Sequence, residues 1–267
     1  MTKSWLQIDR DTDLGALPAG DTPGWKGGKD AAHIEAQALR ERLDALQRRL
    51  FAENRRSLLL ILQAVDAGGK DGAVRKVFAG VNPRGVRAVA FEAPTEPERA
   101  HDFLWRVHRE APPAGAIGVF VRSHYEDVVT ARVRGDVPEA VWQARYAHIR
   151  HFESLLHDAG TRIVKVFLHI DRDEQKERLL ARLREPEKLW KFDPGDLDDR
   201  ARWDDFMRAY RDAIVQTHRP HAPWFVIPAN RKWFRDLALL RLLVETLQDM
   251  DPRYPPAAFD PDAVTID

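Results

Sequence analysis

The sequence predicts an α/β fold in which a parallel sheet lies between two layers of helices. Short apolar runs without alternation are typical of strands buried on both faces, and they recur along the chain. These runs are 57–65, 86–91, 116–121, 163–170 and 224–227. Charged segments with helical periodicity separate them, near 72–79, 96–110, 137–159, 173–184 and 231–249. Because strands and helices alternate, we expect parallel strands with helices on both faces of the sheet.

The remaining segments predict one main domain with additions. Residues 1–30 are rich in Gly and Pro without a sustained period, which indicates an extended arm lying over the domain. Apolar residues at helical spacing predict an amphipathic helix over 30–55. The insertion 185–218 is rich in Asp, Arg, Lys and Trp, contains a predicted helix over 197–217, and has the composition of a mobile lid. We therefore expect a single domain over 31–256 and an irregular C-terminal tail over 257–267.

The composition restricts the class of protein. Forty-two Lys and Arg residues balance 42 Asp and Glu residues, so the net charge gives no argument for binding nucleic acid or a membrane. The absence of cysteine excludes disulfides, thiolate metal sites and a thiol nucleophile, and it fits a reducing compartment. The longest apolar run, 58–62, is too short to span a bilayer. These features predict a soluble, cytoplasmic protein.

A glycine-rich string between a predicted strand and a predicted helix is the main functional signal. It reads Asp-Ala-Gly-Gly-Lys-Asp-Gly over 66–72, and it is called the phosphate loop below. Glycines let successive backbone N–H groups turn toward one anion, the helix N-terminus adds partial positive charge, and Lys70 adds a full charge. Asp66 adds a carboxylate that a magnesium ion or an incoming nucleophile could use. A short Gly-Gly-Lys alone is equally compatible with an ordinary turn, so the strand and helix around it matter.

Two positions differ from the ordinary ATP-binding loop. Ala64 stands where its first glycine falls, and Asp71 replaces the hydroxyl residue that normally reaches magnesium. An ordinary ATPase is therefore not the favoured interpretation.

The string over 62–72 resembles the loop of the family-2 polyphosphate kinases, which typically read Gly-x-Asp-Ala-Ala-Gly-Lys-Asp/Gly-Gly. Colinear similarity covers about 30–256 and includes the strings 80–83, 93–95, 101–106, 122–128, 190–192, 200–203, 222–224, 227–229 and 232–234. The resemblance implies a three-layer α/β/α P-loop fold similar to thymidylate kinase, with a helical lid. It also implies an enzyme that uses polyphosphate and magnesium, with manganese as a substitute, to phosphorylate nucleotides reversibly. Two strings, 103–106 and 122–128, look most like the subgroup that accepts both AMP and ADP.

The resemblance also implies roles for individual residues. Asp66 would orient the acceptor phosphate and hold the metal, while Lys70 and Arg122 would complete the catalytic set. The phosphate-binding loop residues would be Gly68, Gly69, Asp71 and Gly72. The implied partners are inorganic polyphosphate and adenine or guanine nucleotides, without nucleic acid or membrane, in a homodimer or homotetramer.

The sequence pattern alone also makes Arg122 a candidate for binding phosphate. It comes directly after the predicted strand 116–121, at the carboxyl edge of a parallel sheet, where ligands bind. Glu126 and Asp127 lie just beyond, within reach of magnesium or an acceptor, although helix capping explains them nearly as well. Arg132, one turn further, is a third candidate for nucleotide binding.

More basic residues could bind the polyanion. Arg75 and Lys76 lie one turn into the helix after the phosphate loop, where a solvated helix face is an equally good explanation. Lys188, Lys191 and Arg200 fall in the lid, whose closure would exclude water, although salt bridges with the acidic residues of the lid would also explain them.

Val121 is the main departure from the family pattern, because many members carry a magnesium-binding Asp at this position and the dual-acceptor subgroup often carries Asn. A valine offers neither a metal ligand nor a hydrogen bond. Gly68 and Ala64 also exchange the usual Ala and Gly. Two alternatives therefore stay open: an ATP-dependent nucleotide kinase on the same scaffold, and a polyphosphate- or nucleotide-binding protein with impaired catalysis.

Overall fold

Five parallel strands form one sheet in the computed structural model, which describes residues 13–266. The strands are β1 (Ser57–Gln63), β2 (Val86–Ala90), β3 (Ile117–Val121), β4 (Thr161–His169) and β5 (Trp224–Pro228), and their order across the sheet is β2-β3-β1-β4-β5. Each strand coincides with a run predicted from the sequence. The α/β fold with a parallel sheet is therefore confirmed.

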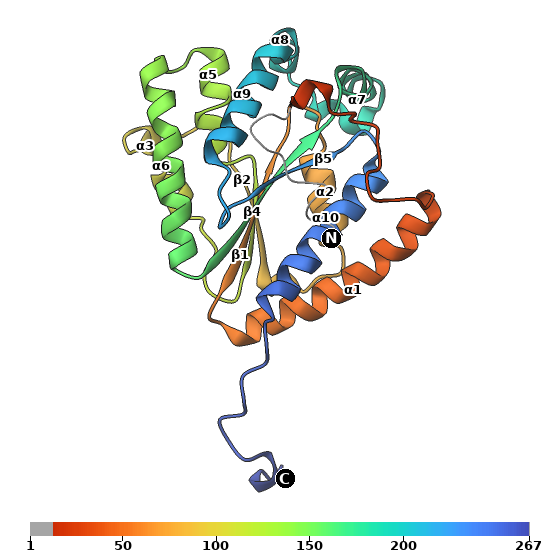
Figure 1. Ribbon diagram of the computed structural model, residues 1–267, viewed down its shortest axis with the longest axis vertical. Helices are drawn as coiled ribbons and strands as arrows, with labels where there is room; N and C mark the ends of the chain where they lie inside the picture. The colour runs from red at the N-terminus through yellow and green to blue at the C-terminus, as the bar shows by residue number, and fades with distance from the viewer. Residues whose placement is uncertain (1–12, 267) are drawn as a thin grey trace.

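Helices cover both faces of this sheet (Figure 1). One layer contains α1 (Lys29–Glu53), α2 (Lys70–Val77) and α10 (Lys232–Met250), and the other contains α5 (Thr130–Arg134), α6 (Glu139–Asp158) and α9 (Trp203–Thr217). The central strand β1 is buried along its whole length, as its continuous apolar run Leu58 to Leu62 requires between two helical layers.

The prediction of burial on both faces is wrong for β2. This strand lies at the edge of the sheet and pairs only with β3, and Arg87, Ala88 and Ala90 are exposed. A run of small and apolar residues does not distinguish a central strand from an edge strand, because position in the sheet is decided by long-range pairing.

Two predicted helices are interrupted in the structure. The segment 96–110 forms two single turns, α3 (Glu96–Arg99) and α4 (Trp105–His108), because the side chain of Asp102 accepts a hydrogen bond from Leu104 N and turns the chain between them. Helix α7 (Arg172–Arg184) precedes the insertion, which contains η4 (Pro186–Lys191), α8 (Gly195–Ala201) and α9. The predicted single helix over 197–217 breaks at Arg202, whose ψ of 26° is not helical.

The N-terminal arm lies over the carboxyl ends of β4 and β5. Leu14 is fully buried, His169 Nε2 is 2.9 Å from Leu17 O, and Asn230 N donates to Ala19 O at 3.2 Å. Residues 1–12 of the predicted arm lie outside the described residues.

The chain after α10 leaves the body of the protein and is irregular apart from the short turn η5 (Pro261–Ala263) (Figure 1). Within residues 13–266, no helix combines the length and the apolar character that crossing a membrane would need.

Candidate functional site

The register of the sheet brings the phosphate loop and Arg122 together. β1 and β3 are parallel neighbours, with Leu62 paired to Val121, and Arg122 N donates to Leu62 O at 3.2 Å. The chain leaves β1 toward β2 on one side, and β4 lies on the other side of β1. This arrangement places the phosphate loop at the topological switch point, where ligands of open α/β sheets bind.

Side chains from α7 and α10 hold carbonyl groups of the phosphate loop from outside. Gln175 Nε2 donates to Asp66 O at 3.1 Å, Arg178 Nη1 to Ala67 O at 3.1 Å, and Arg235 Nη1 to Gly69 O at 3.1 Å. Tyr210 OH, on α9, donates to Ala64 O, two positions before the loop, at 3.0 Å. With their carbonyls engaged outward, the peptide units at the start of α2 can direct N–H groups toward an anion.

The backbone of the loop depends on glycine at two positions. Gly69, the N-cap of α2, has a φ of 92°, and a Cβ there would lie 2.5 Å from Arg235 Nη1. A Cβ on Gly68 would lie less than 3.0 Å from Ala64 Cβ and 2.8 Å from Val65 O. The methyl group of Ala64 therefore occupies space that a side chain at position 68 would need.

Lys70 begins α2 and is buried beneath the loop. Its Nζ donates to Ala64 O at 2.7 Å, so the ammonium group is held at the centre of the loop. Burial lowers the pKa of Lys70, while the carboxylates of Asp66 and Glu126 act in the opposite direction. A phosphate oxygen at this position would meet a cation already removed from bulk water.

Arg122 faces Asp66 from the end of β3, with Arg122 Nη2 and Asp66 Oδ1 3.7 Å apart. The backbone of Arg122 is in the left-handed region, with a φ of 62°, which is uncommon for a non-glycine residue and often marks a functional site. Partial burial acts to lower the pKa of Arg122, but the nearby carboxylates of Glu126 and Asp66 outweigh it and raise this pKa above its ordinary value. The site thus combines Lys70, Arg122, Asp66 and Glu126.

A divalent ion would find few protein ligands in this site. Asp66 is partly exposed and can offer carboxylate oxygens, whereas Val121 is buried and apolar. Within residues 13–266, no group of three or more His, Cys, Asp or Glu residues is arranged to hold a metal ion. The residues present fit a magnesium ion that is bound through one carboxylate, water and substrate phosphates, the usual arrangement for this ion in phosphoryl transfer.

Helix α8, part of the predicted lid segment 185–218, lies next to Asp66 of the phosphate loop and meets it through an acidic residue, Asp199. Burial and a hydrogen bond with Asp66 raise the pKa of Asp199 on α8. Arg134 donates two hydrogen bonds to the same Asp199 carboxylate, from Nε at 3.1 Å and from Nη2 at 2.7 Å. Arg200 Nη1 donates to Gln175 Oε1 at 2.9 Å, so the lid is also attached to a residue that holds the loop.

Asp127 and Arg132 lie near the site but point to other partners. Asp127 Oδ2 is 3.9 Å from Arg106 Nη2 and its Oδ1 is 3.7 Å from Arg145 Nη1, and burial raises the pKa of this carboxyl to about 6. Arg132 pairs with Asp212 at 2.8 Å. These contacts connect η3 (His124–Asp127) and α5 to neighbouring helices. Glu126 accepts a hydrogen bond from Thr130 Oγ1 at 2.6 Å and lies close enough to Lys70 and Arg122 for its carboxylate to act on the pKa of both.

The remaining basic candidates are on the surface. Arg75 and Lys76 are exposed on α2, as a solvated helix face would be. Lys188 pairs with Glu185, and the ammonium of Lys191 lies 4.9 Å from the ring centre of Trp190. The structure does not bring these four side chains together with Lys70 and Arg122.

The residues that hold the loop from outside were not predicted. Arg178 and Gln175 come from α7 and Arg235 from α10, more than a hundred positions after the loop, and many other arginines share the same helices. A partial signal exists in the string 232–234, which ends one position before Arg235. Their burial next to a backbone carbonyl is a tertiary feature that helical periodicity does not reveal.

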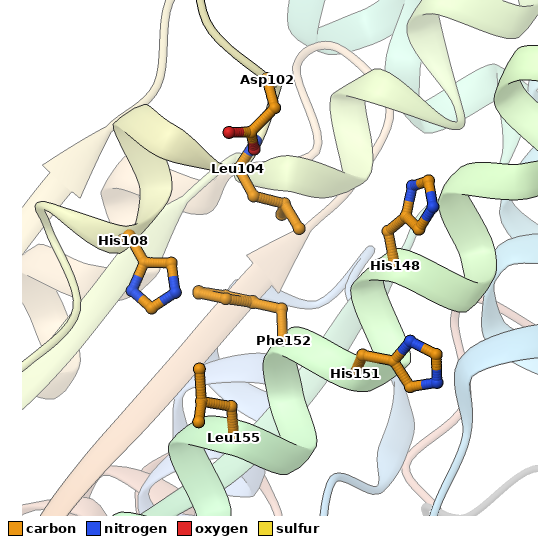
Figure 2. Close-up of a pocket in the computed structure, with 7 residues that line it drawn as sticks. All are labelled: Asp102, Leu104, His108, His148, His151, Phe152 and Leu155. Carbon is orange, nitrogen blue, oxygen red and sulfur yellow. The ribbon is translucent and has the colours of Figure 1, made fainter.

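A surface groove elsewhere on the protein is lined by α4 and α6 and has a volume of about 350 Å³ (Figure 2). Phe152 lies between His108 on one side and His148 and His151 on the other. None of its lining residues belongs to the phosphate loop or the lid, so the groove is separate from the site described above.

Comparisons with known proteins give a consistent result. The sequence profile of the Polyphosphate kinase 2 family matches residues 26–255. The AMP/ADP-polyphosphate phosphotransferase of Meiothermus ruber is 51% identical over 255 residues, which is 96% of each chain. The ADP-polyphosphate phosphotransferase of Rhodopseudomonas palustris is 44% identical over 91% of this chain and 88% of its own.

A solved structure agrees with the sequence comparisons. The crystal structure of polyphosphate kinase 2 from Arthrobacter aurescens TC1 superimposes with a TM-score of 0.95 at 45% identity, covering 98% of this chain and 94% of the other. The resemblance inferred from the motifs is therefore confirmed over most of the chain.

Proposed function

Because the chain belongs to the polyphosphate kinase 2 family, we propose that it transfers the terminal phosphate of inorganic polyphosphate to ADP and AMP, in a reversible reaction. The observation that carries the proposal is the convergence of Lys70, Arg122 and Asp66 beside a loop whose carbonyls are held outward. Relatives named for AMP, ADP and polyphosphate support the choice of substrates.

The residues of the site suit in-line phosphoryl transfer, which needs positioning and charge stabilisation more than covalent chemistry. Lys70 and the first amides of α2 would bind oxygens of one phosphate, and Arg122 would bind the transferring group with a forked contact. Asp66, next to Arg122, would orient the acceptor phosphate. A bound magnesium ion would neutralise phosphate charge in this site.

The lid would act by excluding water from the phosphate loop. Asp199 now shares a hydrogen bond with Asp66, and that contact would give way when phosphates enter, because carboxylates and phosphates repel each other. Arg134 and Arg200 hold α8 over the loop and would keep the lid close to the substrate.

The direct test compares phosphate donors. Protein is incubated with magnesium and AMP or ADP, together with either polyphosphate or a second nucleoside triphosphate, and the products are separated by ion-exchange chromatography. We expect ADP and ATP to form from polyphosphate. If phosphate comes only from the triphosphate, the chain is an ATP-dependent nucleotide kinase. If polyphosphate binds and neither acceptor is phosphorylated, the chain is a polyphosphate-binding protein in which Val121 has impaired catalysis.

Finer properties are also part of the proposal. We expect activity with guanine as well as adenine nucleotides, dependence on Mg²⁺ with Mn²⁺ as a substitute, and a homodimer or homotetramer. We further propose a single catalytic domain over 31–256 with the lid at 185–218, acting in the cytoplasm without binding nucleic acid or a membrane.

A further inference from the structure

We propose that Tyr125, Glu153 and Lys165 form a buried positioning network that fixes the turn carrying Arg122 and Glu126 relative to helix α9. These three residues are not expected to touch substrate. The inference rests on the proposed function for its kinetic test, and on the structure alone for a second test.

The turn after β3 is anchored by residues that enter the protein interior. Between Arg122 and Glu126, the residues Ser123, His124 and Tyr125 are fully buried. The Ser123 hydroxyl caps the turn by accepting a hydrogen bond from Tyr125 N at 3.2 Å. The direction of Arg122 and Glu126 therefore depends on where these buried side chains are held.

The partner of the turn is a single carboxylate on α6. Tyr125 OH donates to Glu153 Oε1 at 2.7 Å, and His124 Nε2 lies 3.4 Å from the same oxygen. The other oxygen, Oε2, accepts from Lys165 Nζ at 2.5 Å, and Lys165 also donates to Tyr125 OH at 3.0 Å. Both Glu153 and Lys165 have no exposed surface.

The same lysine reaches the C-terminal end of α9. Lys165 Nζ donates to Thr217 O at 2.9 Å, at the C-terminus of α9, where a cation is favoured by the helix dipole. Tyr125 OH lies 2.9 Å from Thr217 Oγ1. On the same helix, Tyr210 OH contacts Ala64 O beside the phosphate loop. α9 is thus held at one point by the network and at another by the loop.

The energetics of a buried ion pair favour a positioning role over a purely stabilising one. Well-packed apolar side chains often stabilise a core as well as a buried pair does, because desolvating two charges is costly. Lys165 holds the pKa of Glu153 below its ordinary value against the opposing effect of burial. What an apolar core would not supply is a set of directional contacts between η3, α6, β4 and α9.

The test removes one hydroxyl. Tyr125→Phe deletes the donor to Glu153 and leaves the ring in place. The control, Ser57→Ala, removes a buried hydroxyl that pairs with Thr161 Oγ1 at 2.9 Å. This pair lies at the amino-terminal ends of β1 and β4, away from the phosphate loop. We expect Tyr125→Phe to lower kcat for transfer from polyphosphate to ADP about tenfold with KM for ADP within twofold, because small misplacement of reacting groups costs rate. Ser57→Ala should keep kcat within twofold.

A second variant replaces the ion pair. Glu153→Gln with Lys165→Met should remain folded, since both charges are removed together, and should show the same loss of kcat. A kcat within twofold of the wild type in both variants would overturn the proposal. A loss of kcat in Ser57→Ala equal to that in Tyr125→Phe would also overturn it, because the effect would then follow stability.

Hydrogen exchange without substrate tests the network even if no transfer activity is found. Tyr125→Phe should raise the exchange rates of residues 126–129 and of residues 214–218 together, and Ser57→Ala should change neither. Faster exchange in the turn with unchanged α9 would contradict the coupling. An inactive wild type that shows coupled exchange would refute the proposed function and leave the positioning network intact.

Discussion

Exchanging the small residues Ala64 and Gly68 tests how the loop is packed. A Cβ added at Gly68 would lie less than 3.0 Å from Ala64 Cβ and 2.8 Å from Val65 O, whereas ordinary contact begins at 3.4 Å. Overpacking of this kind costs about 1–3 kcal/mol. Gly68→Ala should therefore lower the free energy of unfolding by about 2 kcal/mol and reduce kcat, because the loop amides must move.

Adding Ala64→Gly should recover part of that loss, since it removes one of the two close contacts and leaves Val65 O. Ala64→Gly alone should cost about 1 kcal/mol, through one buried methyl group. Related loops typically carry glycine and alanine at these positions in the opposite order, which the packing explains. Urea unfolding of the two single variants and the double variant gives the coupling energy, which we expect to be at least about 1 kcal/mol. Additivity within about 0.5 kcal/mol would refute the steric argument.

Three further predictions concern single residues. Lys70→Ala should lower kcat/KM for polyphosphate at least about 100-fold with an unchanged circular dichroism spectrum, and full activity would exclude the loop as the phosphate site. Burial raises the pKa of Asp127 from 3.8 to about 6. Between these pH values the native state holds a proton on Asp127 that the unfolded state has lost, so the free energy of unfolding of the wild type falls as the pH rises from about 4 to 6. Urea unfolding should show Asp127→Asn gaining about 3 kcal/mol relative to the wild type between pH 4 and 7, and a constant difference would contradict the shift. Val121→Asn should reduce the magnesium concentration needed for half-maximal activity about tenfold while costing about 1–3 kcal/mol of stability, and an unchanged magnesium dependence would show that position 121 does not contribute to metal binding.

Local signals predicted the layers of the fold and the centre of the site. The apolar run of β1 and the glycines after it are adjacent in sequence, so the phosphate loop and Lys70 could be recognised directly. Arg122 was predicted because it follows a strand, and carboxyl ends of parallel strands meet at one edge. The position of β2 at the sheet edge could not be predicted, since it depends on pairing with β3 alone.

The residues that hold the phosphate loop and the turn after β3 could not be predicted either, because their contacts also depend on tertiary packing. Arg178 and Arg235 resemble any other arginine of a charged helix, and only the fold places them against loop carbonyls. Lys165 lies within an apolar strand, where its buried partner Glu153 on α6 is decided by tertiary packing. Sequence patterns therefore located the groups that would meet phosphate, and they did not locate the groups that hold them.

Phosphate transfer followed by ³¹P nuclear magnetic resonance tests most directly whether Lys70 and its loop carry out transfer from polyphosphate. Polyphosphate, ADP and magnesium are incubated with the wild type and with Lys70→Ala, and the signals of polyphosphate and of the ATP β- and γ-phosphates are recorded together. We expect the wild type to form one ATP for each phosphate lost from polyphosphate and Lys70→Ala to form none. Loss of polyphosphate as free phosphate without ATP, or equal transfer by both proteins, would contradict it.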